Sequence, residues 1–175
     1  STGARGEGYT LGAAYDMTDN YSVYGGYTYD DSDGQVEDSI IAGQKYRYSQ
    51  SLDIYQETKF TQGDTSPGLL NTFGLDYSLE NDWKFGGFIE RGDYDSSTNG
   101  ETRRNSVSTY AKYDGERLDY KGVVEYRRDK GGDEIISRIT THQVDYDLNN
   151  EYDIYGLFDY ADTEDLNTAS NSIYY

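Results

Sequence analysis

Few side chains in this sequence could perform catalysis. The chain contains one histidine, His142, and no cysteine, which excludes a Cys nucleophile, a thiolate metal site and a site built from several histidines. His142 has the same strand parity as Val144 and Tyr146, so we expect a neutral imidazole on an apolar face near an interface. Carboxylates are abundant, but no pair is singled out as a general acid and base. We therefore predict that the protein is not an enzyme and uses no cofactor.

One acidic segment is a candidate for weak binding of Ca²⁺ or Mg²⁺. It lacks the full oxygen-ligand spacing of an EF-hand, so a solvated acidic loop is the alternative. The candidate ligands are Asp30, Asp31, Asp33, Glu37 and Asp38. The formal net charge of -18 disfavours nucleic acid as a partner, because nucleic-acid binding needs a basic surface.

The composition leaves the class of protein open until the pattern is considered. Strong acidity and a hydrophobic content of 34% would fit a disordered chain. The 21 tyrosines argue against disorder, because tyrosine favours strands and wet-dry boundaries. There is no run of 18 apolar residues, so no transmembrane helix is expected. Membrane-spanning strands alternate in polarity and would escape that test.

The pattern that organises the chain is an alternation of apolar and polar residues, interrupted by turns. Tyr9, Leu11 and Tyr15 share one face of the first segment, and the pattern resumes at Tyr21 after a turn at 18–20. The turns centre near residues 19, 50, 81, 115 and 150, so a hairpin repeats every 31 to 35 residues. Its strands have about 9 to 11 residues, enough to cross a bilayer when tilted.

The connections are predicted to alternate between tight turns and long polar loops. The long loops are expected at 30–38, 61–68, 92–104, 128–134 and 162–171. Short periplasmic turns and long outer loops are typical of outer-membrane barrels. We therefore predict an all-β fold, an antiparallel up-and-down transmembrane β-barrel built of consecutive hairpins.

About eleven strands can be counted in the sequence, whereas single-chain bacterial barrels usually have an even number. Residues 1–175 are therefore expected to be an outer-membrane β-barrel domain or a fragment of one, and to form part of a larger barrel. Tyr175 could alternatively be a terminal aromatic residue of the kind that serves as a barrel assembly signal.

Aromatic residues gather near the short turns, as a membrane-water interface would select. This lipid-facing girdle comprises Tyr15, Tyr21, Tyr48, Tyr77, Trp83, Tyr113, Tyr120, Tyr146 and Tyr152. Gln44 and Gln56 also fall on this face, which suggests that they lie near a rim or contact protein. The alternative interpretation is that the tyrosines form the core of a soluble sandwich.

The opposite face is charged and is predicted to line a water-filled lumen, because it is too polar for a dry core. Its candidate lining residues are Lys45, Arg47, Asp53, Glu57, Lys84, Lys112, Asp119, Lys121 and Asp153. Counting outward from the short turns pairs Arg47 with Asp53 and Lys112 with Asp119 across their hairpins.

Four segments carry a resemblance to a known group of proteins: Gly74 to Trp83, Gly87 to Gly92, Gly115 to Tyr120 and Val124 to Arg128. They resemble the barrel domains of large, multidomain outer-membrane proteins of Gram-negative bacteria. The resemblance implies a location in the bacterial outer membrane and the barrel fold, and it brings no catalytic residues.

Two functional hypotheses follow. The favoured one is a barrel that serves as a pore, a translocation channel or the membrane anchor of a larger surface protein. Its partners would be outer-membrane lipid and other domains or subunits of a larger assembly. The alternative is a soluble, secreted all-β adhesion or fibre module whose acidic loops could bind calcium.

Overall fold

The computed structural model describes residues 6–32, 35–63, 67–96, 100–149, 152–167 and 170–174. They form eleven strands and, within the described ranges, no helix, so none that could cross a membrane. The strands are β1 (Gly6–Thr18), β2 (Tyr21–Ser32), β3 (Gln35–Arg47), β4 (Leu52–Gly63), β5 (Gly68–Ser78), β6 (Trp83–Ser96), β7 (Gly100–Asp114), β8 (Leu118–Lys130), β9 (Glu134–Asn149), β10 (Tyr152–Asp165) and β11 (Ser170–Tyr174).

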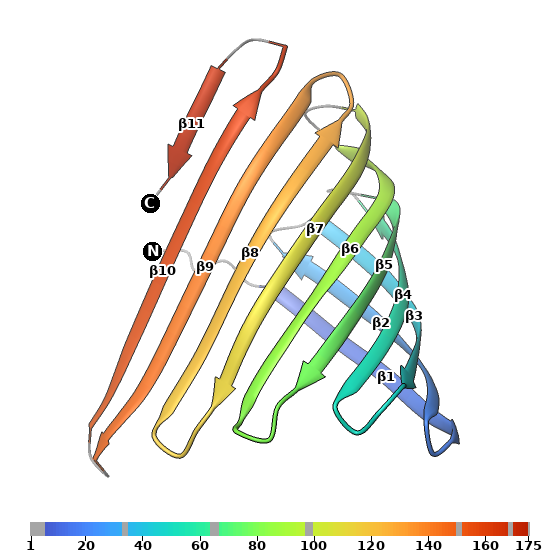
Figure 1. Ribbon diagram of the computed structural model, residues 1–175. Helices are drawn as coiled ribbons and strands as arrows, with labels where there is room; N and C mark the ends of the chain where they lie inside the picture. The colour runs from blue at the N-terminus through green and yellow to red at the C-terminus, as the bar shows by residue number, and fades with distance from the viewer. Residues whose placement is uncertain are drawn as a thin grey trace.

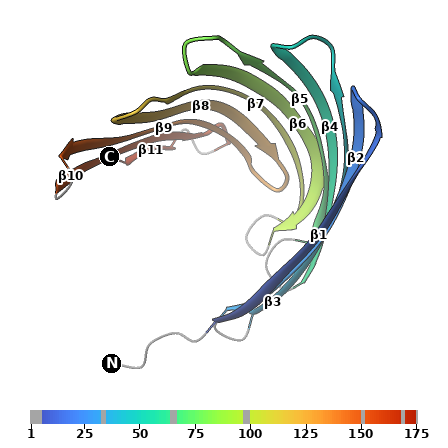
Figure 2. The ribbon, with the colours of Figure 1, turned by 90° about the horizontal axis from the view of Figure 1, so that it is seen from below.

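All strands belong to one antiparallel sheet in which each strand pairs with its neighbours in the sequence. This is the up-and-down order predicted from the hairpin repeat (Figure 1). Seen from below, the sheet curves strongly and is open between β1 and β11 (Figure 2). The sheet therefore has one convex face and one concave face.

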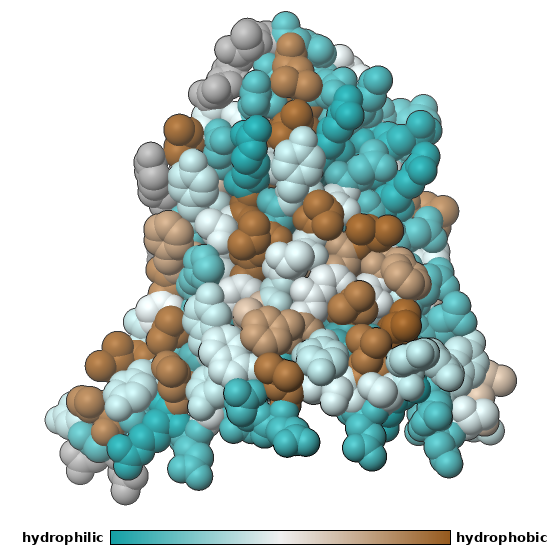
Figure 3. All heavy atoms as spheres, in the orientation of Figure 1, coloured by the Kyte–Doolittle hydropathy of each residue, from teal (hydrophilic) through white to brown (hydrophobic). Residues whose placement is uncertain are grey.

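The alternation in the sequence assigns each face a chemical character. Tyr9 pairs with Tyr29 and Leu11 with Tyr27, so apolar residues of neighbouring strands fall on one side. This outward face is convex, and most of the large hydrophobic side chains are exposed on it. Figure 3 shows hydrophobic side chains across the middle of this face and hydrophilic ones towards both ends.

The sheet is a single layer without a hydrophobic core. Among the described residues no hydrophobic side chain is buried, whereas Ser39, Thr61, Thr102, Ser106 and Ser108 are. These small polar residues all have the parity of the inward, concave face. A soluble sandwich would need a second sheet packed on the apolar face. The outward face must instead be covered by something else that is apolar, since soluble monomers rarely expose so large an apolar surface.

The turns at the lower rim in Figure 1 are short. In the turn between β5 and β6, Asp82 adopts a positive φ of 65°, a conformation that Asp tolerates better than most residues. The Leu79 amide donates to the Trp83 carbonyl at 2.8 Å and closes this turn.

The connections at the opposite rim are shorter than predicted. Strands β2 and β3 extend to Ser32 and Gln35, and β8 and β9 extend to Lys130 and Glu134, so most residues assigned to long loops are strand. The strands accordingly have 11 to 16 residues in β1 to β10. The reason is that polar strand ends can remain paired through their backbones while water solvates both faces.

One predicted cross-strand pair is wrong. Arg47 does oppose Asp53, but Lys112 opposes Lys121, and Asp119 opposes Asp114. The turn is centred one residue later than counted, since the Gly115 amide donates to the Leu118 carbonyl at 3.0 Å. The register therefore shifts by two positions, which leaves every side chain on its predicted face.

Candidate functional site

The inward face carries the charged side chains that could do chemistry or guide a solute. Asp53 lies between two bases, 2.7 Å from the Lys45 ammonium and 3.4 Å from Arg47. Lys84 lies 3.2 Å from Asp76, and Lys112 lies 2.8 Å from Asp114. Most of these charges are therefore compensated locally, as partly exposed ion pairs on a polar surface.

Tyrosines on this face lie flat over glycines of the neighbouring strand. Tyr24 pairs with Gly43, Tyr55 with Gly74 and Tyr110 with Gly86. A Cβ atom added at Gly43 would lie 2.2 Å from the Tyr24 ring, and the other two glycines are equally tight. Only glycine can therefore accept the ring, a covering known as aromatic rescue.

Each of two such rings extends to a carboxylate two strands away. The Tyr24 hydroxyl on β2 donates to Glu57 on β4 at 3.0 Å, and the Tyr110 hydroxyl on β7 donates to Asp76 on β5. Strands are about 4.8 Å apart, so each contact spans about 10 Å of sheet. These contacts tie together three strands at a time.

A second cluster lies near the upper rim, above the apolar band of the outer face. Arg104 forms two hydrogen bonds to Asp129, both at 2.9 Å, and a third to the Tyr94 hydroxyl at 3.1 Å. Partial burial raises the pKa of Tyr94, an effect that Arg104 opposes and Asp129 reinforces. The two hydrogen bonds make this a bidentate, charge-assisted pair.

The inward face of β9 and β10 differs from the rest, because it has acids and no base. Its acidic members in the described part of these strands are Asp145, Asp147, Asp153, Asp159 and Asp165. Gln143 donates to Asp145 at 2.8 Å and the Asn167 amide donates to Asp165 at 2.9 Å, and the inward positions of these two strands that the structure describes include no Lys, Arg or His. This side of the concave surface therefore carries a negative field.

The structure places all nine predicted lining residues on the inward face. It brings together Lys45, Arg47 and Asp53, and it connects Glu57 to Tyr24. Lys112 and Lys121 are opposed rather than paired with acids across the hairpin. Whether this face lines a water-filled lumen stays a prediction.

The predicted aromatic girdle lies on the outward face near the lower rim. Trp83 packs against Tyr113 and Tyr120, with ring centroids 5.1 Å and 6.2 Å apart. Tyr15, Tyr48 and Tyr152 are highly exposed, at 70%, 70% and 62%. Tyr21, Tyr77 and Tyr146 share their face, by the register of their strands.

A second aromatic ring was missed from the sequence. Phe60 stands eight residues from Leu52, Tyr126 eight from Leu118 and Tyr160 eight from Tyr152, each on the outward face. Tyr9 stacks on Tyr29 at the same height, with ring centroids 5.4 Å apart. Eight residues at about 3.3 Å each, in strands tilted by about 40°, separate the two rings by about 20 Å.

Outward charges are confined to the zone at and above the second ring. Between the rings, the described outward positions carry no Asp, Glu, Lys or Arg. Above them, Arg103 pairs with Asp93 at 2.9 Å and Arg138 with Asp162 at 2.8 Å. This distribution matches an apolar band of about 25 Å between two interfaces, and the strands continue beyond it into water.

The candidate cation ligands do not converge. Asp30 and Glu37 oppose each other on the inward face, whereas Asp31 and Asp38 have outward parity, and Asp33 lies outside the described residues. The Tyr27 hydroxyl donates to Asp38 at 2.5 Å. In the ranges that the structure describes, no three metal-ligating side chains gather.

His142 lies on the outward face, as its parity predicted. Its Nδ1 is 2.8 Å from the Tyr120 hydroxyl and its Nε2 is 3.0 Å from the Thr140 hydroxyl. The ring lies between the aromatic rings of Tyr120 and Phe158. Among the residues that the structure describes, its side-chain contacts are these hydrogen bonds and ring contacts, with no carboxylate.

The comparisons with known proteins concern the fold. No protein-family model and no curated protein matches the sequence. OmpT, an outer membrane protein of Vibrio cholerae, has a similar structure, with a TM-score of 0.62 and 13% identity over 93% of this chain. The KdgM porin is also similar, with a TM-score of 0.51 and 10% identity over 98% of this chain.

The match covers 89% of the KdgM porin, but the chain spans only 58% of OmpT. The solved neighbours are outer-membrane barrels, in agreement with the location expected from the sequence. They do not support the finer expectation of a domain from a large multidomain protein. The open, curved sheet of this chain has the fold of bacterial outer-membrane β-barrels.

Proposed function

We propose that this chain forms part of the wall of a water-filled pore in the bacterial outer membrane. The observation that carries the proposal is the contrast between its two faces. The convex face is apolar between two aromatic rings, and the concave face holds partly exposed ion pairs such as Lys45–Asp53. A surface of this kind is stable only against water, so the barrel interior is a solvent-filled lumen rather than a packed core.

The barrel that contains this wall is larger than the eleven strands. In an up-and-down sheet with eleven strands, β1 and β11 run in the same direction. Antiparallel closure therefore requires an odd number of additional strands, whether from the same protein or from another subunit. The lower coverage of OmpT, at 58%, supports this proposal.

The pore is expected to prefer cations. On most of the inward face acids and bases compensate each other, but the stripe on β9 and β10 has only carboxylates. Fixed negative charge along a pore concentrates cations, and the effect weakens as salt shortens the Debye length from about 30 Å at 0.01 M to about 10 Å at 0.1 M. No catalytic step is part of this proposal.

The test is ion conductance of the intact protein in planar bilayers under a salt gradient. We expect open channels whose reversal potential indicates cation preference at low salt. Replacing Asp145, Asp153 and Asp159 with Asn should reduce this preference. A matched control neutralises three outward acids instead, Asp93, Asp162 and Glu164, and should leave it unchanged.

The outcomes separate the alternatives. Anion preference, or equal effects of the two triple variants, would contradict the assignment of the acidic stripe to the lumen. Folded protein that inserts into the bilayer without conductance would favour a membrane anchor. A protein that stays in solution without detergent would favour the secreted module.

A further inference from the structure

Two hollows adjoin each other on the outward face of β5, β6 and β7. The lower one, of about 510 Å³, is lined by apolar side chains, and the upper one, of about 430 Å³, includes polar ones. Phe73 and Ile89 line both. The two hollows therefore form one continuous groove whose lining surface is largely apolar, with the side chains of Asn71, Arg91 and Asn105 at the border of its upper part.

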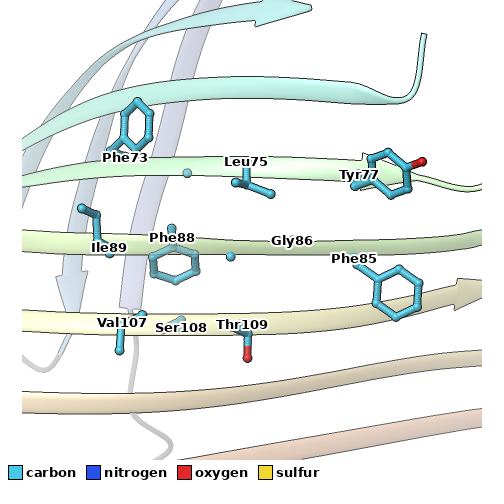
Figure 4. A pocket seen from close by; sticks show the side chains of 12 residues that line it. Phe73, Leu75, Tyr77, Phe85, Gly86, Phe88, Ile89, Val107, Ser108 and Thr109 are labelled. Carbon is cyan, nitrogen blue, oxygen red and sulfur yellow. The ribbon is translucent and has the colours of Figure 1, made fainter. Parts of the chain in front are cut away.

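The lower hollow lies between the two aromatic rings. Leu75, Phe85 and Val107 surround it, and Gly87 leaves space at its centre because it has no side chain. Figure 4 shows these side chains on three adjacent strands. Their height between the rings places the hollow in the apolar band, where acyl chains are the surrounding solvent.

The upper hollow interrupts the second aromatic ring. At the height where β4, β8 and β10 carry Phe60, Tyr126 and Tyr160, strands β5, β6 and β7 carry Asn71, Arg91 and Asn105. These three oppose each other directly across the strands and line the upper hollow. All three can donate hydrogen bonds, and no carboxylate stands in their row on these strands.

Arg91 is the outward base of this row. In the described part of the chain it forms no ion pair, whereas Arg103 on the next strand is 2.9 Å from Asp93. Glu90, which also borders the hollow, belongs to the inward face. The positive charge of the Arg91 guanidinium is therefore not compensated by a described acid and can interact with an anion in the groove.

A chain of hydrogen bonds orients Asn71. It runs from the Tyr21 hydroxyl to Gln44 at 2.6 Å and from Gln44 to Gln56 at 2.9 Å. It continues from Gln56 to Thr58 at 3.3 Å, and the Thr58 hydroxyl donates to the Asn71 side-chain oxygen at 2.8 Å. Because the side-chain oxygen of Asn71 accepts this hydrogen bond, its amide nitrogen can donate to a ligand. Gln44 and Gln56, the two glutamines of the lipid face, are the middle members of the chain.

We propose that this groove binds a phosphate-bearing lipid of the outer leaflet. Arg91, Asn71 and Asn105 hold the phosphate, and one acyl chain occupies the apolar hollow below. Arg recognises phosphate through charge-assisted, bidentate hydrogen bonds. The order of the two parts matches such a lipid, with its headgroup at the interface and its chain towards the membrane centre. The inference needs the membrane location, and the orientation expected from the sequence with the turns of the lower rim in the periplasm, but not an open lumen.

The test measures binding of lipid A, with and without its phosphates, to the intact protein in detergent by native mass spectrometry. Arg91→Gln combined with Asn105→Ala should weaken binding of phosphorylated lipid A by roughly tenfold or more. Arg103→Gln is the matched control, because this outward base already pairs with Asp93, and it should leave binding unchanged. Thr109→Phe should fill the lower hollow and weaken binding while all three donors remain.

Heat-modifiable migration on gels establishes that each variant folds. Failure of excess inorganic phosphate to displace lipid A would support a lipid site, since both parts of the groove contribute. Equal binding of dephosphorylated lipid A, or full binding by the Arg91→Gln, Asn105→Ala variant, would overturn the proposal. Displacement by phosphate alone would indicate a simple anion site. Loss of a dimer in the same variant, without loss of lipid, would assign the groove to a second copy of the chain.

Discussion

The contact between Tyr24 and Gly43 can be tested by adding a single methyl group. In Gly43→Ala the new Cβ would lie 2.2 Å from the Tyr24 ring, so the ring must leave its position and lose its hydrogen bond to Glu57. A hydrogen bond to a charged group contributes about 1.5 to 3 kcal/mol. Alanine returns about 0.5 to 1 kcal/mol, because glycine in a strand has a higher entropic cost. We expect a net destabilisation of about 0.5 to 2.5 kcal/mol.

Gly12→Ala is the matched control. Gly12 also lies on the inward face, but a Cβ there would meet only the Gly25 carbonyl oxygen at 3.5 Å, an ordinary contact. The same substitution should therefore be neutral or slightly stabilising. Because the substitution is the same at both positions, opposite changes in stability cannot come from intrinsic strand propensity.

The assay is equilibrium unfolding of the intact protein in detergent, with the free energy extrapolated from the denaturant dependence. A double-mutant cycle with Tyr24→Ala then isolates the contact. With the ring absent, Gly43→Ala should no longer destabilise the protein. Equal effects of the Gly12 and Gly43 substitutions, or a Gly43 penalty that persists without the ring, would refute the reasoning.

Three further predictions concern the faces, the register and the upper cluster. Spin labels at Ile154 and Phe158 should be relaxed by lipid-soluble oxygen, and labels at the inward positions Asp153 and Asp159 by a water-soluble reagent; the reverse pattern would invert β10. Paired cysteines at Lys112 and Lys121 should form a disulfide more readily than cysteines at Lys112 and Asp119, since the first two oppose each other; preference for the second pair would restore the register counted from the sequence. Arg104→Leu should destabilise the protein by about 1.5 to 3 kcal/mol, because Asp129 and Tyr94 lose their partner. Arg103→Leu should destabilise it by less than about 1 kcal/mol, because the Arg103–Asp93 pair is exposed. Comparable unfolding midpoints for the two variants would count against a special role of the upper cluster.

The strands and faces could be predicted because alternation and turn residues are local signals. Tyr9, Leu11 and Tyr15 mark a strand whatever surrounds them, and each short turn determines the direction of the next strand. The ends of the strands could not be predicted in this way. Asp30, Asp31 and Arg128 have the composition of a loop, but their backbones remain paired with the adjacent strand.

The contacts between tyrosine and glycine could not be predicted either, because they depend on where the strands end. Tyr24 and Gly43 are joined through the upper connection, and a register across it can be counted only when its length is known. The loop expected at 30–38 concealed the pairing, although Tyr24 and Tyr55, like Gly43 and Gly74, are 31 residues apart. The second aromatic ring could not be predicted for a different reason: it lies eight residues from the turns, so its height follows only once the length of the strands is known.

The regular spacing of these residues has a consequence for how such a barrel could have arisen. Gly12, Gly43 and Gly74 recur at intervals of 31 residues, and Tyr24 and Tyr55, which lie over Gly43 and Gly74 of the next strand, recur at the same interval. A hairpin duplicated as a unit would carry its own tyrosine and its own glycine. Gene duplication could thus widen the barrel by one hairpin at a time, because each copy would bring a tyrosine for the glycine of the next hairpin.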